Sequence, residues 1–315
     1  MPEIVIPVGE FDLEQTLESG QCFRWKRVRA GEYIGVIGRS ALHIQQVPRR
    51  LLSDPLASAA RGDARSNVLL VRFIGGRVPQ EAERAIVQYF DLSRDYPAIL
   101  RQLRHDAALA SVVPRRAGIH ILRQEPFETI ISFIISANNH IPRIRLILER
   151  LCARYGEEIR TPWGPMYSFP RPDVLAEARL ADLREHCGLG YRDRYVLATA
   201  RAIAECADFA SWSTWPTLVL RRRLLALEGV GEKVADCILL FGFHRLEAFP
   251  VDTWIARAMQ ALYFPDRIPR LREIRACAVE RFGSYAGVAQ QYLYAAFRAG
   301  KKVARPSREP IEEAW

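Results

Sequence analysis

The sequence predicts an α+β fold, with an antiparallel β-sheet and accompanying helices in residues 1–113 and a mostly α-helical domain in residues 114–300. Two observations support this division. Short runs of β-branched and aromatic residues, separated by glycine, lie in the first part. In the second part, apolar residues recur at helical spacing, with proline and glycine at the joints. Residues 301–315 are polar, contain two prolines and are expected to form a loosely attached tail.

The first part is predicted to contain a short helix, then strands, then two longer helices. The short helix covers Asp12–Ser19 and ends at Gly20. The strands and the following helices are Cys22–Val28, Glu32–Ile37, Leu42–Val47 and Asn67–Ile74, then Gln80–Phe90 and Tyr96–Leu109. Residues 48–66, which contain Pro, Ser, Asp and Arg, are predicted to be a loop. We therefore expect a small antiparallel sheet with helices packed on it.

The second part is predicted to be almost entirely helical. Its joints are marked by Pro162, Pro165, Pro170 and Gly190. The expected helices cover residues 125–137, 141–155, 179–186, 191–206, 216–227, 231–242, 252–262, 270–282 and 285–299.

Composition restricts the class of protein. The net charge is +9 and the pI is near 9.5, which favours a polyanionic partner, although a basic enzyme with another substrate would have the same charge. The six cysteines, at positions 22, 152, 187, 206, 237 and 277, form no C-x-x-C pair. They are expected to be reduced thiols, with no zinc site and no iron–sulfur cluster. The sequence shows no signal peptide and no apolar run that could span a membrane.

The segment Leu227–Cys237, LEGVGEKVADC, predicts a helical hairpin. Gly229, Val230 and Gly231 separate two apolar helical runs, and glycine allows both a sharp turn and a close approach to a ligand. The second helix begins at this turn, so its free N–H groups and positive dipole end are available. Such a helix start can bind an anion, for example one DNA phosphate.

Lys233 and Asp252 are the candidate catalytic residues. Of the 45 basic residues four are lysines, at positions 26, 233, 301 and 302, so arginine supplies the ordinary surface charge. Because lysine can lose its proton where arginine cannot, a lysine at a glycine-flanked helix start is a candidate amine nucleophile. On residue type alone, a solvated surface lysine is the commoner interpretation. Asp252, in Pro-Val-Asp before another helix, fits an N-cap, a catalytic carboxylate, or both.

These motifs resemble the helix-hairpin-helix DNA glycosylase superfamily, and most closely the 8-oxoguanine DNA glycosylases. Four further segments agree in chain order, and the resemblance covers roughly residues 11 to 300: Gly20–Trp25, Ser136–Arg143, Gly188–Tyr195 and Tyr285–Gln290. It implies a helix-hairpin-helix glycosylase domain and a bifunctional enzyme. Such an enzyme flips 8-oxoguanine, opposite cytosine, out of double-stranded DNA, excises it and nicks the abasic site through a Schiff base. Lys233 would be the nucleophile and Asp252 its electrostatic partner.

The resemblance also implies a lesion pocket. The backbone carbonyl of Gly20 would read the N7 hydrogen that distinguishes 8-oxoguanine from guanine, and Gln290 would bond the Watson–Crick edge. Cys237 would lie against one face of the base and Tyr294 against the other, where the family usually has phenylalanine. On residue type alone, these four are a helix end, two core residues and a solvated glutamine.

The strand opposite the lesion would be held by a second group. By resemblance, Asn138, Arg143 and Arg192 contact the cytosine that loses its partner, since their directional donors suit base edges. Tyr191 would enter the gap left in the duplex. The ordinary alternatives are a helix C-terminal turn for the asparagine and solvated helix faces for the arginines. The chain departs from the family at His140, where a third asparagine is common.

A further departure is Trp254, where the family suggests histidine. The chain lacks the cysteines of the iron–sulfur cluster that some related glycosylases carry, so no cofactor is expected, although a monovalent or divalent cation at the hairpin stays open. We expect a monomer, cytoplasmic and nucleoid-associated in a bacterium or nuclear in a eukaryote. Three alternatives remain: a glycosylase for another lesion such as an alkylated base, a non-catalytic DNA-binding module, and a basic enzyme with a small-molecule substrate. Lys233 argues against the first, because alkylation-specific relatives generally lack it.

Overall fold

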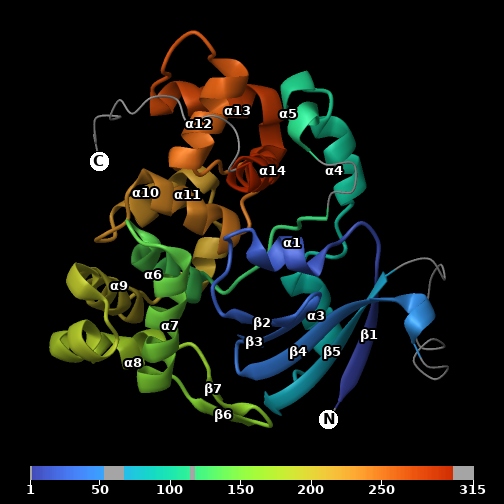
Figure 1. The fold of residues 1–315 in the computed structure, drawn as a ribbon. Coiled ribbons are helices and arrows are strands. Elements are labelled where there is room, and N and C mark those ends of the chain that lie inside the picture. Colours follow the sequence, from blue (N-terminus) through green and yellow to red (C-terminus); the bar gives the residue numbers. More distant parts are fainter. Residues whose placement is uncertain (1, 53–66, 114–117, 301–315) are drawn as a thin grey trace.

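The computed structural model describes residues 2–52, 67–113 and 118–300. A five-stranded sheet lies beside a larger body of helices (Figure 1). The predicted α+β architecture is therefore confirmed, with the sheet in the first part of the chain. The predicted tail, 301–315, and most of the predicted loop, 48–66, lie outside the described residues.

The sheet is antiparallel throughout, in the order β1-β5-β4-β3-β2. Its strands are β1 (Glu3–Val8), β2 (Trp25–Arg29), β3 (Glu32–Ile37), β4 (Ser40–Pro48) and β5 (Asn67–Gly76). Strand β1 was not predicted, and it pairs with β5 at one edge of the sheet. Its Pro7 weakens the sequence signal, but an edge strand tolerates proline because one side of it needs no ladder hydrogen bond.

The helices of the first part cover one face of the sheet and then leave it. They are α1 (Leu13–Glu18), α3 (Ala82–Tyr89), α4 (Tyr96–Leu103) and α5 (Ala107–Val112), with a 3₁₀ turn η1 (Arg49–Leu51) after β4. The single helix predicted over Tyr96–Leu109 is wrong. Helix α4 ends before Asp106, which is the N-cap of the next helix, α5. The carboxylate of Asp106 accepts a hydrogen bond from the N–H of Leu109 at 2.9 Å.

The second part contains the expected helices together with shorter elements. In chain order these are α6 (Pro126–Ser136), α7 (Ile141–Tyr155), β6 (Glu158–Thr161), β7 (Gly164–Tyr167), α8 (Pro172–Ala176), η2 (Asp182–His186), η3 (Gly190–Arg192), α9 (Asp193–Ala204), η4 (Phe209–Thr214), α10 (Thr217–Leu225), α11 (Glu232–Phe241), α12 (Thr253–Tyr263), α13 (Leu271–Phe282), η5 (Gly283–Tyr285) and α14 (Ala286–Ala299).

Two expectations for the second part need correction. The antiparallel hairpin of β6 and β7, whose turn uses Gly164 at φ +98°, was not predicted in this almost entirely helical part. The helix predicted over 179–186 is present but ends as the π-helical turn η2, in which the N–H of Cys187 reaches back five residues to the carbonyl of Asp182. Side-chain periodicity does not reveal that change in hydrogen bonding.

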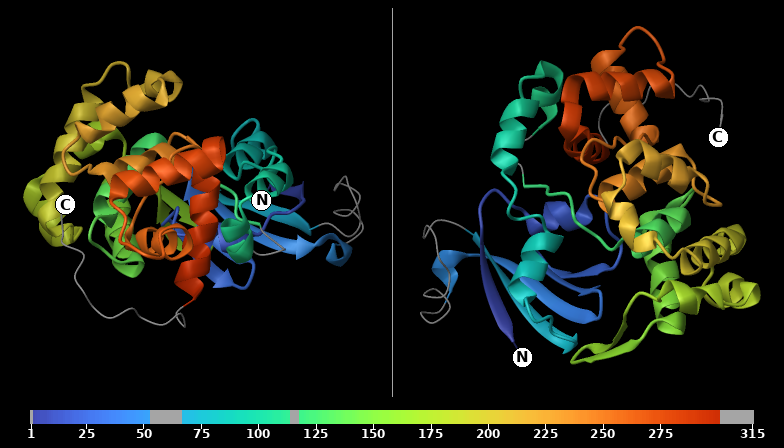
Figure 2. Two further views of the ribbon diagram at one scale, coloured as in Figure 1. Left: turned by 90° about the horizontal axis from the view of Figure 1, so that it is seen from above. Right: turned by 180° about the vertical axis from the view of Figure 1, so that it is seen from behind.

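The two largest hydrophobic clusters lie in different parts of the fold. The smaller one lies between the sheet and helices α1 and α3, and the larger one fills the helical part. Tyr96, Leu100 and Leu109, from α4 and α5, belong to the larger cluster, and α5 packs on α14. Figure 2 shows this placement from behind. The core of the helical part thus includes residues of α4 and α5, which precede residue 113 in the chain. The predicted domain boundary between residues 113 and 114 stays a prediction.

Candidate active site at the helical hairpin

The predicted hairpin is formed by α10 and α11 and depends on Gly229. This residue has φ +78°, and a Cβ atom on it would lie 2.7 Å from Cγ of Tyr195. Val230 is buried at the turn. Gly231 is the N-cap of α11, and no side chain caps the helix there. The N–H groups of the first turn of α11 therefore have no side-chain cap, and free N–H groups at a helix start can bind an anion.

Lys233 lies half-buried in the first turn of α11. Its Nζ is 5.6 Å from the ring centroid of Phe133 on α6, a contact that the sequence analysis missed. One turn further along, burial raises the pKa of the Cys237 thiol to about 11, although Lys233 opposes this through its charge and a hydrogen bond. The thiol is therefore protonated at neutral pH, and it suits contact with a base rather than nucleophilic attack.

Asp252 is the N-cap of α12, and its Oδ1 accepts a hydrogen bond from the N–H of Ile255 at 2.8 Å. The capping interpretation is confirmed, and the cap fixes the carboxylate in place. Burial raises the pKa of the Tyr294 hydroxyl, and the charges of Asp252 and Lys233 both act on that hydroxyl. The same two charges act on the Cys237 thiol, so these four side chains share one site.

Gly20 approaches the site from the first part of the chain. It has φ +82°, and a Cβ atom on it would lie 3.3 Å from the hydroxyl of Tyr294. Its neighbour Gln21 is fully buried, and its Nε2 donates to the carbonyls of Thr16 and His120 at 3.0 and 2.9 Å. These hydrogen bonds hold the loop that contains Gly20 in place. Gln21 was missed by the sequence analysis, and its position inside an apolar motif was the available signal.

Gln290 and Tyr294 approach the site from α14. Gln290 is buried, and its Nε2 donates to the carbonyl of Pro250 at 3.3 Å, two residues before Asp252. Tyr294 is half-buried, and its hydroxyl accepts from Nη1 of Arg298 at 3.4 Å. The structure thus brings together all of the predicted catalytic and lesion-pocket residues.

The residues predicted to hold the opposite strand form a second group around the end of α6. Asn138 adopts φ +53° there, a helix C-terminal turn as its ordinary interpretation required. Arg192 is buried and donates to the carbonyls of Ala137 and Asn138 at 2.6 and 2.9 Å. Its guanidinium also lies 4.4 Å from the ring centroid of Tyr191, which is 52% exposed. Arg192 therefore supports this turn, and its contact with cytosine stays a prediction.

Two departures from the family pattern, His140 and Trp254, both lie near the start of a helix. His140 is the N-cap of α7, where its Nδ1 accepts from the N–H of Arg143 at 3.3 Å, as an asparagine cap would. The side chain of Arg143 itself is exposed. Trp254 is exposed at the start of α12, and the guanidinium of Arg257 lies 5.9 Å from its ring centroid. An aromatic ring with an adjacent cation thus lies near the start of the helix that Asp252 caps.

All six cysteines are free thiols. Within residues 2–52, 67–113 and 118–300, no cluster of three or more His, Cys, Asp or Glu side chains could hold a metal ion. Over the same residues, no helix is long and apolar enough to cross a membrane.

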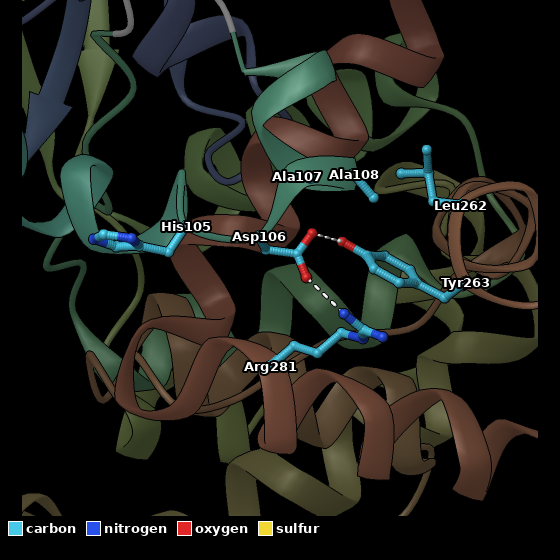
Figure 3. Close-up of a pocket in the computed structure, with 7 residues that line it drawn as sticks. All are labelled: His105, Asp106, Ala107, Ala108, Leu262, Tyr263 and Arg281. Atoms are coloured by element: carbon cyan, nitrogen blue, oxygen red, sulfur yellow. Dashed lines mark hydrogen bonds and ion pairs between the residues drawn. The ribbon is translucent and has the colours of Figure 1, made fainter.

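A cavity of about 590 Å³ lies away from this site, between the α4–α5 junction and the ends of α12 and α13 (Figure 3). Asp106 at its wall accepts hydrogen bonds from the hydroxyl of Tyr263 at 2.8 Å and from Arg281 at 2.9 Å. These polar groups satisfy one another and join three helices, so we assign them a structural role.

The fold and the hairpin site define a helix-hairpin-helix base excision DNA repair protein, and residues 131–283 match the family described as "HhH-GPD superfamily base excision DNA repair protein". Residues 3–130 match the family described as "8-oxoguanine DNA glycosylase, N-terminal domain". The chain belongs to the 8-oxoguanine DNA glycosylase family of this superfamily.

Named relatives align over nearly the whole chain. A probable N-glycosylase/DNA lyase of Methanothermobacter thermautotrophicus is 35% identical over 92% of this chain and 94% of its own. The N-glycosylase/DNA lyase of Saccharomyces cerevisiae is 30% identical over 93% of this chain and 85% of its own. Among solved structures, the Clostridium acetobutylicum 8-oxoguanine glycosylase/lyase, in complex with double-stranded DNA containing cytosine opposite 8-oxoG, is 34% identical. It covers 92% of each chain with a TM-score of 0.78.

Proposed function

We propose that this chain excises 8-oxoguanine, opposite cytosine, from double-stranded DNA and then cleaves the strand at the abasic site. It is a bifunctional DNA N-glycosylase and abasic-site lyase. The observation that carries this proposal is the placement of Lys233 in the first turn of α11 and of Asp252 as the N-cap of α12, with the charges of both acting on the buried Cys237 and the half-buried Tyr294. The names of the relatives that span the chain support the same activity.

The chemistry begins at the bond between base and sugar. As this bond breaks, positive charge develops on the sugar, and the fixed carboxylate of Asp252 stabilises it. The amine nitrogen of Lys233 attacks C1′, and the base departs with the bonding electron pair and takes up a proton. Opening of the sugar ring then gives a Schiff base between Lys233 and C1′. Loss of a C2′ proton expels the 3′ phosphate, and water releases Lys233 by hydrolysis of the imine.

Recognition uses the pocket walls. The carbonyl of Gly20 accepts from the N7 hydrogen that guanine lacks, and Gln290 bonds the Watson–Crick edge. The neutral Cys237 thiol and the Tyr294 ring lie on opposite faces of the base. The close approach of Tyr294 to Gly20 supports this arrangement, since both must contact the same guest.

The DNA itself is held by two regions. The first-turn N–H groups after Gly231 bind one phosphate of the damaged strand. On the other strand, Asn138, Arg143 and Arg192 contact the unpaired cytosine and Tyr191 fills the gap in the stack. The half-exposed ring of Tyr191 beside the Arg192 guanidinium supports this assignment.

The alternatives receive less support. Similarity to the 3-methyladenine DNA glycosylase of Archaeoglobus fulgidus is 21% identity with a TM-score of 0.69, which concerns the fold alone. A non-catalytic module or a small-molecule enzyme would leave unexplained why the charges of Lys233 and Asp252 both act on Cys237 and Tyr294. We further infer a monomer that works without a cofactor wherever genomic DNA lies, in the cytoplasm with the nucleoid of a prokaryote or in a nucleus.

Borohydride trapping on a duplex with one 8-oxoguanine opposite cytosine tests the proposal. Native protein should form a covalent complex with this duplex and none with an undamaged one. Lys233→Gln should form no complex, whereas Lys26→Gln, which removes an exposed lysine paired with Glu149, should trap normally. Release of free base without a covalent complex would refute the role of Lys233. Binding without base release or trapping would refute the activity.

A further inference from the structure

Three residues of α14 follow one face of the helix and become steadily more accessible to solvent. Gln290 is 5% exposed, Tyr294 is half-buried and Arg298 is exposed. Residues at i and i+4 lie one above the other on a helix surface, so this face runs outward from Gln290 to Arg298. The proposed lesion pocket is therefore deepest at Gln290 and opens towards Arg298.

The guanidinium of Arg298 is held by Tyr294 and is not neutralised. Its Nη1 donates to the hydroxyl of Tyr294 at 3.4 Å, and its Cζ lies 5.7 Å from the centroid of the same ring. Within the part of the chain that the structure describes, no carboxylate forms an ion pair with Arg298. A guanidinium carries several N–H donors, so most of them remain available to a further partner.

Arg298 also lies close to the two candidate catalytic residues. Burial raises the pKa of the Tyr294 hydroxyl, the charge of Arg298 opposes that rise, and the charges of Asp252 and Lys233 act on the same hydroxyl. The ordinary interpretation of Arg298 is a cation that interacts favourably with the dipole at the end of α14, in whose last turn it lies. That interpretation accounts for the charge, but it does not require the contact with Tyr294.

The mouth of the pocket is where the DNA backbone must lie. A flipped nucleotide stays joined to its strand through two phosphates, so its sugar and phosphates remain outside when its base reaches Gln290. A phosphate is an anion that a guanidinium binds through two parallel hydrogen bonds. Because the Tyr294 hydroxyl holds the guanidinium before DNA arrives, less side-chain freedom is lost on binding.

We propose that Arg298 binds a backbone phosphate of the damaged strand at the mouth of the lesion pocket, and that the Tyr294 hydroxyl positions its guanidinium. This inference rests on the proposed function, in which the base is flipped towards Gln290. It gives the hydroxyl a purpose at a position where the family usually has phenylalanine. Because a phosphate carries no base information, the contact adds affinity and no selectivity for one lesion.

The salt dependence of binding tests the proposal, because each phosphate contact releases counterions from the DNA. The dissociation constant is measured over a series of salt concentrations with a duplex that carries an uncleavable tetrahydrofuran abasic analogue opposite cytosine. Arg298→Gln should weaken binding about fivefold to tenfold at about 0.1 M salt and reduce the slope of log Kd against log salt by about 0.9. Arg298→Lys keeps the charge and should retain the slope. An unchanged slope in Arg298→Gln would overturn phosphate binding.

Arg101→Gln is the matched control. Arg101 is exposed in the last turn of α4, as Arg298 is in the last turn of α14, and it belongs to no group assigned to DNA. Because distant charges are screened by salt, its loss should leave the affinity and the slope at their native values. An equal reduction of the slope in Arg101→Gln would show a general effect of net charge and overturn the assignment to Arg298.

Tyr294→Phe tests the positioning role, because it keeps the aromatic ring and removes the acceptor of the hydrogen bond. In Tyr294→Phe protein, the loss of affinity caused by Arg298→Gln should be about threefold smaller than in native protein. Additive effects of the two substitutions would overturn the role of the hydroxyl. Failure of the native protein to release 8-oxoguanine from a duplex would instead refute the proposed function, which the binding assay does not measure.

Discussion

Replacing Gly229 by alanine is the sharpest test of how the hairpin is built. At φ +78° a residue with a Cβ costs roughly 1–2 kcal/mol relative to glycine. The new Cβ would also lie 2.7, 2.8 and 2.9 Å from ring and Cβ atoms of Tyr195, closer than such contacts permit. Relieving that overlap adds about 1–3 kcal/mol. Gly229→Ala should therefore lower the free energy of unfolding by about 2–5 kcal/mol.

The adjacent glycine provides the matched control. Gly231 has φ −85°, and a Cβ atom on it would meet nothing within 4 Å. Gly231→Ala should change the free energy of unfolding by less than about 1 kcal/mol. The added methyl group stands beside the free N–H groups of α11, so binding to duplex DNA should weaken by about tenfold, or ~1.5 kcal/mol for one hydrogen bond to a charged group.

Urea unfolding of both variants, and of each combined with Tyr195→Ala, measures these effects. Because Tyr195→Ala removes the ring that the new methyl group would overlap, Gly229→Ala should cost less in its presence by about 1–3 kcal/mol. Gly231→Ala should show no such coupling. A loss of under 0.5 kcal/mol in Gly229→Ala, or additive losses with Tyr195→Ala, would refute the steric argument.

Three further predictions concern the carboxylates and the second strand. Asp252→Asn keeps an N-cap, so the melting temperature should change little, while the rate of single-turnover base excision should fall about 10²–10³-fold. A loss of activity matched by an equal loss of stability would contradict a catalytic role for the charge. Although burial opposes it, hydrogen bonds from His43 and other donors lower the pKa of Glu32 to about 2. Because this pKa lies below the usual value, ionised Glu32 stabilises the fold above about pH 4.5, and this contribution is lost as the pH falls towards 2. In an acid titration, the free energy of unfolding of Glu32→Gln should therefore fall less steeply than that of the native protein. Arg192→Lys cannot replace both carbonyl contacts near Asn138, so DNA binding should weaken about 5–30-fold at constant salt, and an unchanged affinity would refute this role.

Local motifs were readable from the sequence because their causes act over a few residues. Gly229 and Gly231 marked the hairpin, and Asp252 was predicted as a cap because its carboxylate needs only the N–H three residues on. The break at Asp106 has the same kind of cause, yet the apolar periodicity across it concealed the cap. The edge strand β1 was concealed by Pro7, and its pairing with β5 depends on residues 59 to 69 positions away.

The sequence by itself determined which chemistry-bearing groups the chain carries and which local turns expose them: the lone lysine at a glycine-flanked helix start, the capping aspartate and the glycine that ends the first helix. Only the tertiary structure decided what surrounds them. Phe133 lies near Lys233, Gln21 fixes the loop of Gly20, and the carbonyl of Pro250 orients Gln290. Backbone preferences and helix caps are set by neighbours in sequence. Contacts between residues forty or a hundred positions apart arise only when the whole core packs, so no local pattern encodes them.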